Sequence, residues 1–266
     1  MLVKEFRQKS NLGIKGILIL CQIEFKAFWK NKNILVSQIV QPIMYYMFLV
    51  MGIGSTIGMV SFGEIEVPYE LYAMVGVMGL LITSQMTQTI YRTTIDKRWG
   101  LLPLKFLSGI TPTYYILGMS TYPTIGFVFQ STIVYFLALI SGFEIVFFNF
   151  ILALVIAVIS LLFWTSLGVL ITVFINDYQK RDTIIAMLIL PIGFSAPTFY
   201  LIDNVPLYIN IVARLNPLTY QITAIRSVLF NEVQYNFLFI SVVITIISII
   251  ISTIVLRRSK LVVKER

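Results

Sequence analysis

The chain has 266 residues, of which 58% are hydrophobic and only 12% are charged, and its 20 Lys and Arg outnumber its 12 Asp and Glu to give a net charge of +8. Soluble domains are about 45–50% apolar and about 25% charged, so this composition excludes an ordinary soluble domain. The sequence has one cysteine, Cys21, and no histidine, which excludes an intrachain disulfide and removes the commonest metal ligand and general base.

The first 32 residues predict a cytoplasmic helix that lies in the membrane interface. Seven cations are spread along this segment, and no small-residue cleavage site follows an apolar core, so residues 1–32 do not form a signal peptide. Leu20, Cys21, Phe25 and Phe28 fall mostly on one helical face, and the lysines fall on the others. Basic amphipathic helices of this kind are typical of membrane surfaces.

The next two apolar runs predict membrane-spanning helices at 33–57 and 70–92, because about 20 apolar residues are needed to cross a bilayer. A short polar loop joins them, and Pro42 predicts a kink in the first. Both spans contain polar but uncharged residues, namely Gln38, Gln41, Tyr45, Thr83, Gln85, Thr87 and Gln88. Such residues often hold membrane helices together, at about 0.6 kcal/mol per hydrogen bond, but they could equally line a translocation path. Both roles stay open.

A cytoplasmic stretch at 93–112 is too charged to span the membrane and too apolar for a plain linker. Its candidate contact residues are Lys97, Arg98, Trp99, Gly100, Leu101, Leu102, Pro103, Leu104 and Phe106. A short amphipathic helix parallel to the membrane fits this pattern, with Gly100 and Pro103 able to set its turn. Such a helix could insert into a groove on a soluble partner or touch only lipid, and the residues alone do not decide between the two.

Further spans are predicted at 113–141, 147–175 and 183–200. The tight charged loop NDYQKRD precedes the last of these, which Pro191 and Pro197 interrupt. A sixth span is predicted at 236–256, and a basic cytoplasmic tail, 257–266, follows it.

The segment 198–232 is broken by Pro206 and Pro217 but is too apolar for a free loop. It predicts an outer re-entrant element, made of short helices that dip into the outer leaflet and cap the pore. Two arginines in this segment would need partners at that depth. The arginines are Arg214 and Arg226, and the candidate partners are Asp203, Glu232 and lipid phosphates.

The distribution of charge predicts the topology. With six spans both termini lie on one side of the membrane, and that side collects 18 of the 20 Lys and Arg and six of the 12 Asp and Glu. Its net charge is then +12, against −4 on the other side. Cytoplasmic segments carry an excess of Lys and Arg, so both termini are predicted to be cytoplasmic. The predicted fold is an all-α membrane protein whose six-span domain covers 33–256.

No catalytic or nucleotide-binding motif occurs in the sequence. It contains no G-x-x-x-x-G-K-[ST], HExxH, CxxC or GxSxG pattern. None of the predicted spans clearly carries an ionisable residue near its middle, as carriers driven by protons or sodium usually do. This favours a transporter that is powered from outside the chain. A stand-alone channel or secondary carrier, and a membrane scaffold or receptor, are the alternatives from other classes.

Three segments resemble the permease subunits of ABC-2-type exporters. The first is EFKAFWKNKNILVSQIVQPIMYYMFLVMG, the second DKRWGLLPLKFLSGITPTYYILGMS, and the third FSAPTFYLIDNVPLYINIVARLNPLTYQITAIRSVLF. The third is similar to the family's outer signature through Pro206, Asn216, Pro217, Leu218, Thr219, Tyr220 and Arg226. The second is similar to its cytoplasmic D-R-E-x-G region, but Arg98 stands where that family usually has glutamate. No role of that glutamate can be carried over.

The resemblance implies a transmembrane permease subunit that is not itself an enzyme. Two permease chains, identical or different, would form the pathway in the cell membrane, in contact with its lipids. Two copies of a separate ABC ATPase would drive export, dock on a coupling helix within 94–112 and hold ATP and Mg. This chain would bind no cofactor, metal or nucleic acid. The Met- and aromatic-rich first two spans favour an amphipathic or lipid-like cargo such as a drug, lipid or peptide, with lipid-linked polysaccharide as the alternative.

Overall fold

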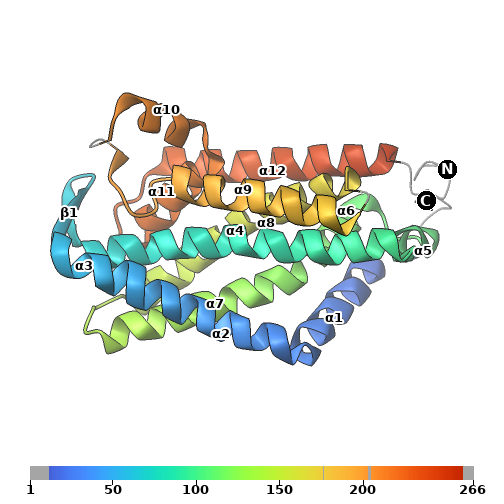
Figure 1. Ribbon diagram of the computed structural model, residues 1–266, viewed down its shortest axis with the longest axis horizontal. Coiled ribbons are helices and arrows are strands. Elements are labelled where there is room, and N and C mark those ends of the chain that lie inside the picture. Colours follow the sequence, from blue (N-terminus) through green and yellow to red (C-terminus); the bar gives the residue numbers. More distant parts are fainter. Residues whose placement is uncertain (1–11, 176, 203–204, 260–266) are drawn as a thin grey trace.

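The computed structural model describes residues 12–175, 177–202 and 205–259, which form an elongated helical bundle with one short sheet (Figure 1). In chain order the elements are α1 (Ile14–Lys30), α2 (Lys32–Tyr45), the π-helix η1 (Tyr46–Met51), α3 (Gly52–Ile57), β1 (Met59–Phe62), β2 (Ile65–Pro68), α4 (Tyr69–Arg98), α5 (Leu101–Leu107), α6 (Pro112–Met119), α7 (Thr121–Ile140), α8 (Phe147–Val173), α9 (Tyr178–Ser195), α10 (Leu207–Leu215), α11 (Pro217–Leu229) and α12 (Tyr235–Arg258). The central helix is α4, which packs against α7, α8, α9 and α11.

The bundle has two distinct ends (Figure 1). At one end, the α5 end, lie α5, α1 and the C-terminal end of α12. At the other, the hairpin end, lie β1, β2 and α10. Both termini were predicted to lie on one side of the membrane, and α1 and the end of α12 do lie at the same end of the bundle. The assignment of that end to the cytoplasm stays a prediction from charge.

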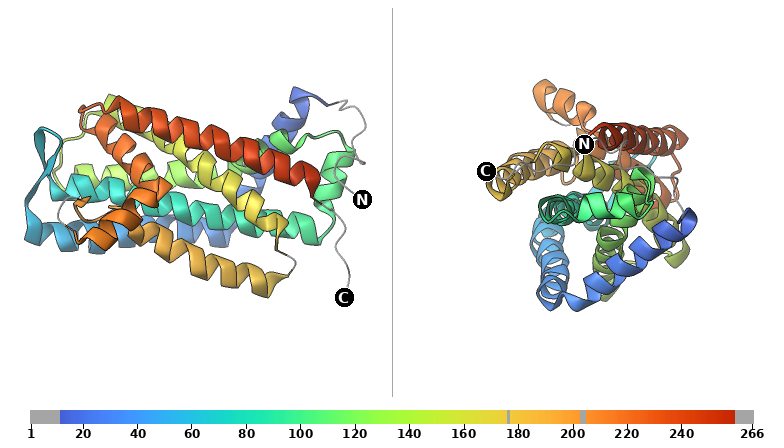
Figure 2. Two further views of the ribbon diagram at one scale, coloured as in Figure 1. Left: turned by 90° about the horizontal axis from the view of Figure 1, so that it is seen from above. Right: turned by 90° about the vertical axis from the view of Figure 1, so that its right-hand side faces the viewer.

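Five helical stretches in the described chain are long and apolar enough to cross a membrane, which makes this a multi-pass membrane protein. They are Lys32–Ile57, Tyr69–Arg98, Pro112–Ile140, Phe147–Val173 and Tyr235–Arg258. The helix α9 runs beside α4 at the edge of the bundle (Figure 2). It is not one of the five, because Lys180, Arg181 and Asp182 leave it a shorter apolar stretch. The six-span layout therefore stays a prediction.

Two prolines interrupt the predicted first and third spans. Pro42 has no N–H to donate, and the helix widens just beyond it into η1, where the N–H of Tyr46 donates to Pro42 and Ile43 carbonyls. The third predicted span is divided into α6 and α7 at Ser120. Its Pro123 likewise lacks an N–H, and its ring crowds the carbonyl four residues earlier.

A β-hairpin stands where a plain polar loop was expected after the first span, in a chain that is otherwise helical. β1 and β2 pair antiparallel, with Met59 opposite Pro68 and Phe62 opposite Ile65. Alternate residues point inward, and the Phe62 ring packs edge-on against Phe230, 5.5 Å away. This period of two suits a strand that is covered on one face. The hairpin covers the end of α11.

Small hydroxyl residues join α8 to α12. Ser160 and Ser241 share a hydrogen bond of 3.1 Å between their Oγ atoms, and Ser166 and Ser248 share one of 2.6 Å. One turn beyond Ser248, the Ser252 hydroxyl donates to the Ser166 carbonyl at 2.9 Å. Small polar residues let membrane helices approach closely, so this pair of helices is fixed by hydrogen bonds as well as by apolar contact.

The segment that was expected to be re-entrant contains α10 and α11. Pro206 and Pro217 do not break these helices, because Pro206 stands just before α10 and Pro217 is the first residue of α11. α11 packs against α4, α8 and α12, whereas α10 projects from the bundle (Figure 2). The predicted depth of the two helices in the outer leaflet stays a prediction.

Candidate functional site

The short helix α5 has one buried and one exposed face. Leu102 and Phe106 are 6% and 4% exposed, and the Phe106 ring lies 5.8 Å from that of Tyr115. A short helix on a bundle must bury one face. In α5 this face carries Leu102 and Phe106, which pack against the bundle and are not free to contact a partner. This corrects their prediction as contact residues. Trp99, just before the helix, is 73% exposed, and Leu104 is 59% exposed.

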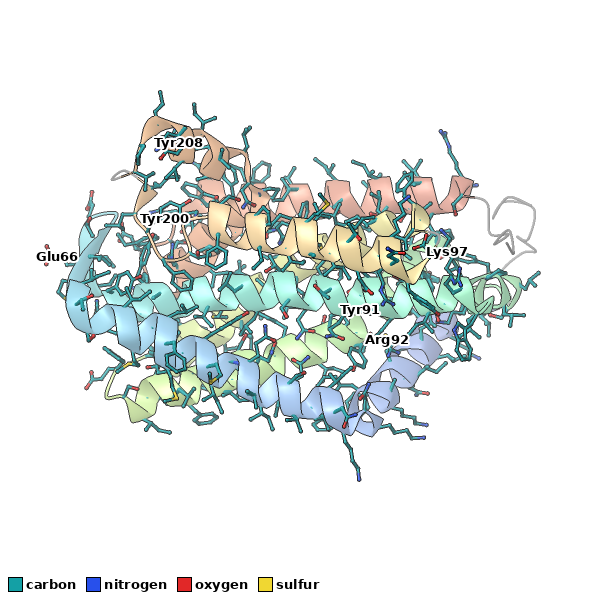
Figure 3. The ribbon with its side chains drawn as sticks, viewed as in Figure 1. Glu66, Tyr91, Arg92, Lys97, Tyr200 and Tyr208 are labelled. Atoms are coloured by element: carbon teal, nitrogen blue, oxygen red, sulfur yellow. The ribbon has the colours of Figure 1, made fainter. Side chains whose placement is uncertain are left out.

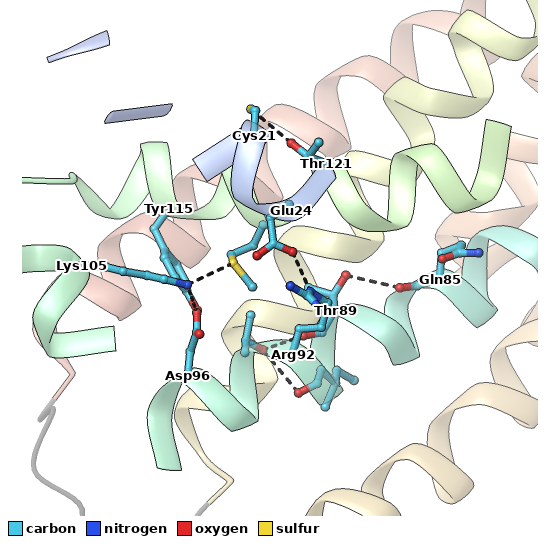
Figure 4. A network of polar contacts seen from close by, with 12 residues as sticks. Cys21, Glu24, Gln85, Thr89, Arg92, Asp96, Lys105, Tyr115 and Thr121 are labelled. Atoms are coloured by element: carbon cyan, nitrogen blue, oxygen red, sulfur yellow. Dashed lines mark hydrogen bonds and ion pairs between the residues drawn. The ribbon is translucent and has the colours of Figure 1, made fainter. Parts of the chain in front are cut away.

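A buried carboxylate anchors α5. Asp96, near the end of α4, accepts hydrogen bonds from Lys105 Nζ on α5 and from the Tyr115 hydroxyl on α6, the latter at 2.8 Å (Figure 4). Asp96 is only 6% exposed, and a buried charge is tolerated when it is paired and hydrogen-bonded. α5 is thereby held to two membrane helices. The left-handed backbone of Gly100, with φ of 70°, makes the turn between α4 and α5.

A second buried ion pair fixes α1. Arg92 Nε lies 2.6 Å from Glu24 Oε2, and Glu24 is 1% exposed (Figure 4). The guanidinium carbon of Arg92 also lies 4.2 Å from the centre of the Tyr122 ring, which is a cation–π contact. The pair links α1 with α4 and α7. This pair was not predicted from the sequence. Its signal there was Glu24, a carboxylate on the apolar face of the predicted interfacial helix.

The cations of the 93–112 stretch differ in role. Lys97 Nζ points inward and donates to the carbonyls of Thr172, Val173 and Ile175, at 3.2, 2.7 and 2.7 Å (Figure 3). Helices often end with a lysine at their free carbonyls, so Lys97 caps α8, although the sequence predicted it as a contact residue. Arg98 is exposed.

The loop before α9 belongs to the same surface. Trp99 Nε1 donates to the Tyr178 hydroxyl at 3.2 Å, and the guanidinium of Arg98 lies 5.2 Å from the centre of the Tyr178 ring. The stretch 176–182 was predicted to be a tight charged loop. In the structure α9 already begins at Tyr178, which joins this stretch to the start of α5, while residue 176 itself lies outside the described residues.

An apolar groove separates α1 from α5. It has a volume of 270 Å³ and is open to the surface. Its lining residues are Ile19, Leu20, Ile23, Leu101, Leu104, Lys105, Ser108 and Ile110. The α5 end therefore presents an apolar surface on two helices that are each held to the bundle by a buried ion pair.

The polar residues of the first two spans fall into two groups, of which the first is a buried amide network. Gln85 Nε2 donates to Gln38 Oε1 and to Gln130 Oε1, both at 2.8 Å, and Gln130 Nε2 donates to Gln41 at 3.2 Å. Gln38, Gln85 and Gln130 are at most 2% exposed. Gln38 and Gln85 thus hold α2, α4 and α7 together, which is the packing alternative. Gln130 was missed by sequence reasoning, and Gly126 one turn earlier leaves space for the amides.

The second group surrounds a pocket of 190 Å³ between the first span, α4 and α9. Five of the predicted pathway residues line it, namely Gln41, Tyr45, Thr83, Thr87 and Gln88. The other lining residues are Leu49, Leu80, Ser84, Ile189, Leu190, Gly193 and Phe194. A role of these residues in translocation stays a prediction.

The outer motif at 216–220 organises the turn between α10 and α11. Asn216 Oδ1 accepts from the N–H of Leu218 and caps α11, while Asn216 Nδ2 donates to the Ile192 carbonyl at 2.7 Å. The hydroxyl of Thr219 donates to the Ala213 carbonyl, and that of Tyr220 to the Arg214 carbonyl. The motif fastens α10 and α11 to the end of α9.

Arg226 is 1% exposed and holds the segment that follows α9. Its guanidinium donates to the carbonyls of Tyr72, Pro197 and Thr198 at 2.9–3.2 Å and lies 3.4 Å from the centre of the Tyr72 ring. These groups replace the predicted partners Glu232 and lipid phosphate, because carbonyls and a ring face compensate the charge where water is excluded. The third candidate, Asp203, lies outside the described residues.

Burial lowers the pKa of Arg226 to about 10, which still leaves the guanidinium protonated near neutral pH. Two tyrosine hydroxyls extend its contacts along the same segment: Tyr69 donates to the Phe199 carbonyl at 2.9 Å and Tyr72 to that of Tyr200 at 3.1 Å. Figure 3 shows Tyr200 at the hairpin end, far from Lys97 at the α5 end. Four successive carbonyls, 197–200, are therefore held by side chains of α4 and α11.

The bundle is that of a multi-pass membrane protein, because five of its described helical stretches are long and apolar enough to span a bilayer. The family model described as ABC-2 type transporter matches residues 15–230. The chain therefore belongs to the ABC-2 type transporter family, which confirms the resemblance seen in the sequence. A comparison with curated proteins finds no match. The chain is a transmembrane component of an ABC transporter, in a family whose membrane domains lack an ATPase site and work with an ABC ATPase.

Proposed function

We propose that this chain is the permease half of an ATP-driven exporter and that it receives mechanical work from a separate ATPase at the α5 end. The observation that carries the proposal is the apolar groove between α1 and α5, together with the exposed Trp99 just before α5. Exposed apolar patches mark interaction sites, and aromatic residues dominate the energetics of interfaces.

The attachment of this surface suits the transmission of force. A push on α5 reaches α4 and α6 through Asp96, and a push on α1 reaches α4 and α7 through the pair of Glu24 with Arg92. Buried ion pairs are rigid, because displacing one partner leaves a charge uncompensated. Motion of the ATPase would therefore move membrane helices and would not be lost in a loose loop.

The proposed topology has six crossings in the cell membrane, with both termini cytoplasmic. α9 is the fifth crossing, since it runs from the α5 end to the hairpin end beside α4 (Figure 1). Its Lys180, Arg181 and Asp182 lie within its first five residues, where they can reach water and lipid head groups. The excess of cations at the α5 end supports a cytoplasmic location for that end.

The proposed pathway lies between two permease chains, each served by one ATPase that holds ATP and Mg. α9 buries only Gly193 among its described residues and leaves Met187, Leu190 and Phe194 more than half exposed. The pocket beside α9 is open at its side, so a second chain on this face would complete it. The polar lining on this face supports a pathway here, whereas α12 leaves aliphatic residues and Phe239 exposed.

The test is association with an ABC ATPase encoded beside this chain. Trp99→Ala should weaken binding by about 30-fold, which corresponds to truncating an aromatic anchor worth about 2 kcal/mol. Tyr208→Ala is the matched control, because Tyr208 is an equally exposed aromatic residue, at 70%, on α10 at the opposite end. Equal effects of the two variants, or no effect of Trp99→Ala, would overturn the proposed coupling surface.

A further inference from the structure

The pocket beside α9 lies near the middle of α4, and hence near the middle of the membrane in the proposed topology. One wall is apolar and comes mainly from α9, with Ile189, Leu190 and Phe194, completed by Leu49 and Leu80. The opposite wall is polar and comes from α4 and α2, with Gln41, Tyr45, Thr83, Ser84, Thr87 and Gln88. The pocket is therefore two-sided, like the amphipathic molecules that partition into bilayers.

No carboxylate, ammonium or guanidinium group lines the pocket among the described residues. A charged group at this depth would be costly, because neither water nor an opposite charge would compensate it. Neutral hydroxyls and amides meet no such penalty and can be satisfied by the polar wall. The lining thus selects against charged head groups.

The polar wall has two unused side chains. Gln41 bonds to Tyr45 and to Ser84, and the Thr83 hydroxyl donates to the carbonyl of Leu80. Across the described chain, neither the Thr87 hydroxyl nor the Gln88 amide has a hydrogen-bond partner, and both side chains are half-buried. Each can donate and accept, so together they offer a pair of hydrogen-bonding groups to a molecule in the pocket.

Gln88 differs in this respect from its neighbour Gln85. Gln85, three residues earlier, is 1% exposed and donates to two other amides, as expected of a residue that packs helices together. Gln88 faces a cavity and makes no such bond within the described residues. A glutamine that only packed helices would be bonded across the interface, so the arrangement of Gln88 points to a ligand.

We propose that this pocket binds the uncharged, hydroxyl- or amide-bearing head group of an amphipathic molecule, with Thr87 and Gln88 as its hydrogen-bonding residues. The apolar part of the molecule lies against Ile189, Leu190 and Phe194. Drug-sized sites occupy about 300–1,000 Å³, so a pocket of 190 Å³ holds a head group and the first part of its chain. That the bound molecule is cargo rests on the proposed export function, but the binding itself does not.

The experiment uses the purified full chain in lipid nanodiscs without any ATPase. The probe is a decyl glycerol with a diazirine in its alkyl chain, and photolabelled peptides are mapped by mass spectrometry. Competitors share the ten-carbon chain and differ only in head group: decyl glycerol is neutral, decyl trimethylammonium is cationic and decyl sulfate is anionic. We expect labelling of α4 and α9, displaced by decyl glycerol at concentrations about tenfold lower than by either charged competitor.

Variants separate specific binding from partition into lipid. Gln88→Leu and Thr87→Val should each weaken displacement by decyl glycerol about 5- to 10-fold, as expected for one lost hydrogen bond. Thr132→Val is the matched control, because Thr132 is a half-buried threonine of α7 outside the pocket whose hydroxyl donates to its own helix. Thermal melting shows whether each variant is folded. If one of the two pocket variants does not fold, the other still tests the proposal.

Three results would overturn the proposal. These are labelling spread evenly over lipid-facing helices such as α12, charged competitors as effective as decyl glycerol, and both pocket variants behaving like Thr132→Val. Each is read without an ATPase, so a failure here is distinguishable from a failure of the coupling surface. Loss of ATPase binding in Trp99→Ala would leave the labelling unchanged.

Discussion

Replacing Arg226 with methionine should destabilise the hairpin end more than any substitution of an exposed arginine. Methionine fills much of the same space but donates no hydrogen bond. The buried carbonyls of Pro197 and Thr198 then lose their side-chain donor, and the Tyr72 ring loses its cation–π contact. The carbonyls of Phe199 and Tyr200 would keep their bonds to Tyr69 and Tyr72, so the segment 196–200 would lose part of its attachment.

The expected magnitude follows from these contacts. Each buried carbonyl left without a donor costs about 1–3 kcal/mol, and a desolvated cation–π contact contributes about 2 kcal/mol. Removing the buried charge of Arg226 offsets part of this loss. We therefore expect a net loss of about 3 kcal/mol. At about 2–4 °C per kcal/mol, this is a fall in melting temperature of roughly 6–12 °C.

The assay is thermal unfolding of the detergent-purified chain, with Arg214→Met as the matched control. Arg214 lies in the same outer segment, but its side chain is exposed, so its loss should change the free energy of unfolding by less than about 0.5 kcal/mol. Arg226→Lys should be intermediate, because one ammonium cannot reproduce the planar fork that serves three carbonyls. Equal melting temperatures for the two methionine variants would refute the buried role of Arg226.

Two further predictions concern α5 and α4. Asp96→Asn should loosen α5, with amide hydrogen exchange in that helix at least about tenfold faster, because a broken buried ion pair is strongly destabilising. Asp182→Asn, whose carboxylate is exposed and pairs with Arg181, should leave that exchange unchanged. Gly76→Ala should lower the melting temperature sharply or prevent folding, since its added Cβ would lie 2.0 Å from a backbone oxygen. Gly52→Ala is the control and should be tolerated, because its added Cβ would have no such atom nearer than 3.6 Å. Similar melting curves for the two variants would contradict this prediction.

Apolar periodicity and charge were enough to predict helices and a membrane location, and the resemblance of three segments indicated the family. The short amphipathic helix after the second span was also predicted, because Trp99 and Leu104 interleave with cations. Its two faces could not be separated from the sequence. Leu102 and Leu104 are chemically alike, and only the position of α5 against Tyr115 buries the first and exposes the second.

Long-range polar contacts were the other part that the sequence did not reveal. The pair of Glu24 with Arg92 joins residues 68 positions apart, and the bond of Gln85 with Gln130 joins residues 45 apart. Composition shows that such groups exist inside apolar helices but not which of them meet. Arg226 is an example. Its charge suggested a carboxylate as its partner, whereas in the structure its guanidinium donates to backbone carbonyls.

The central claim is that this chain moves cargo only when an ABC ATPase drives it. The most direct measurement is transport into proteoliposomes of a panel of labelled neutral amphipaths, including decyl glycerol and a fluorescent phospholipid. The chain alone, the ATPase alone and the two together are compared with and without ATP. The account predicts transport only when chain, ATPase and ATP are all present. Transport by the chain alone, or none of the panel transported by the complete system, would contradict it.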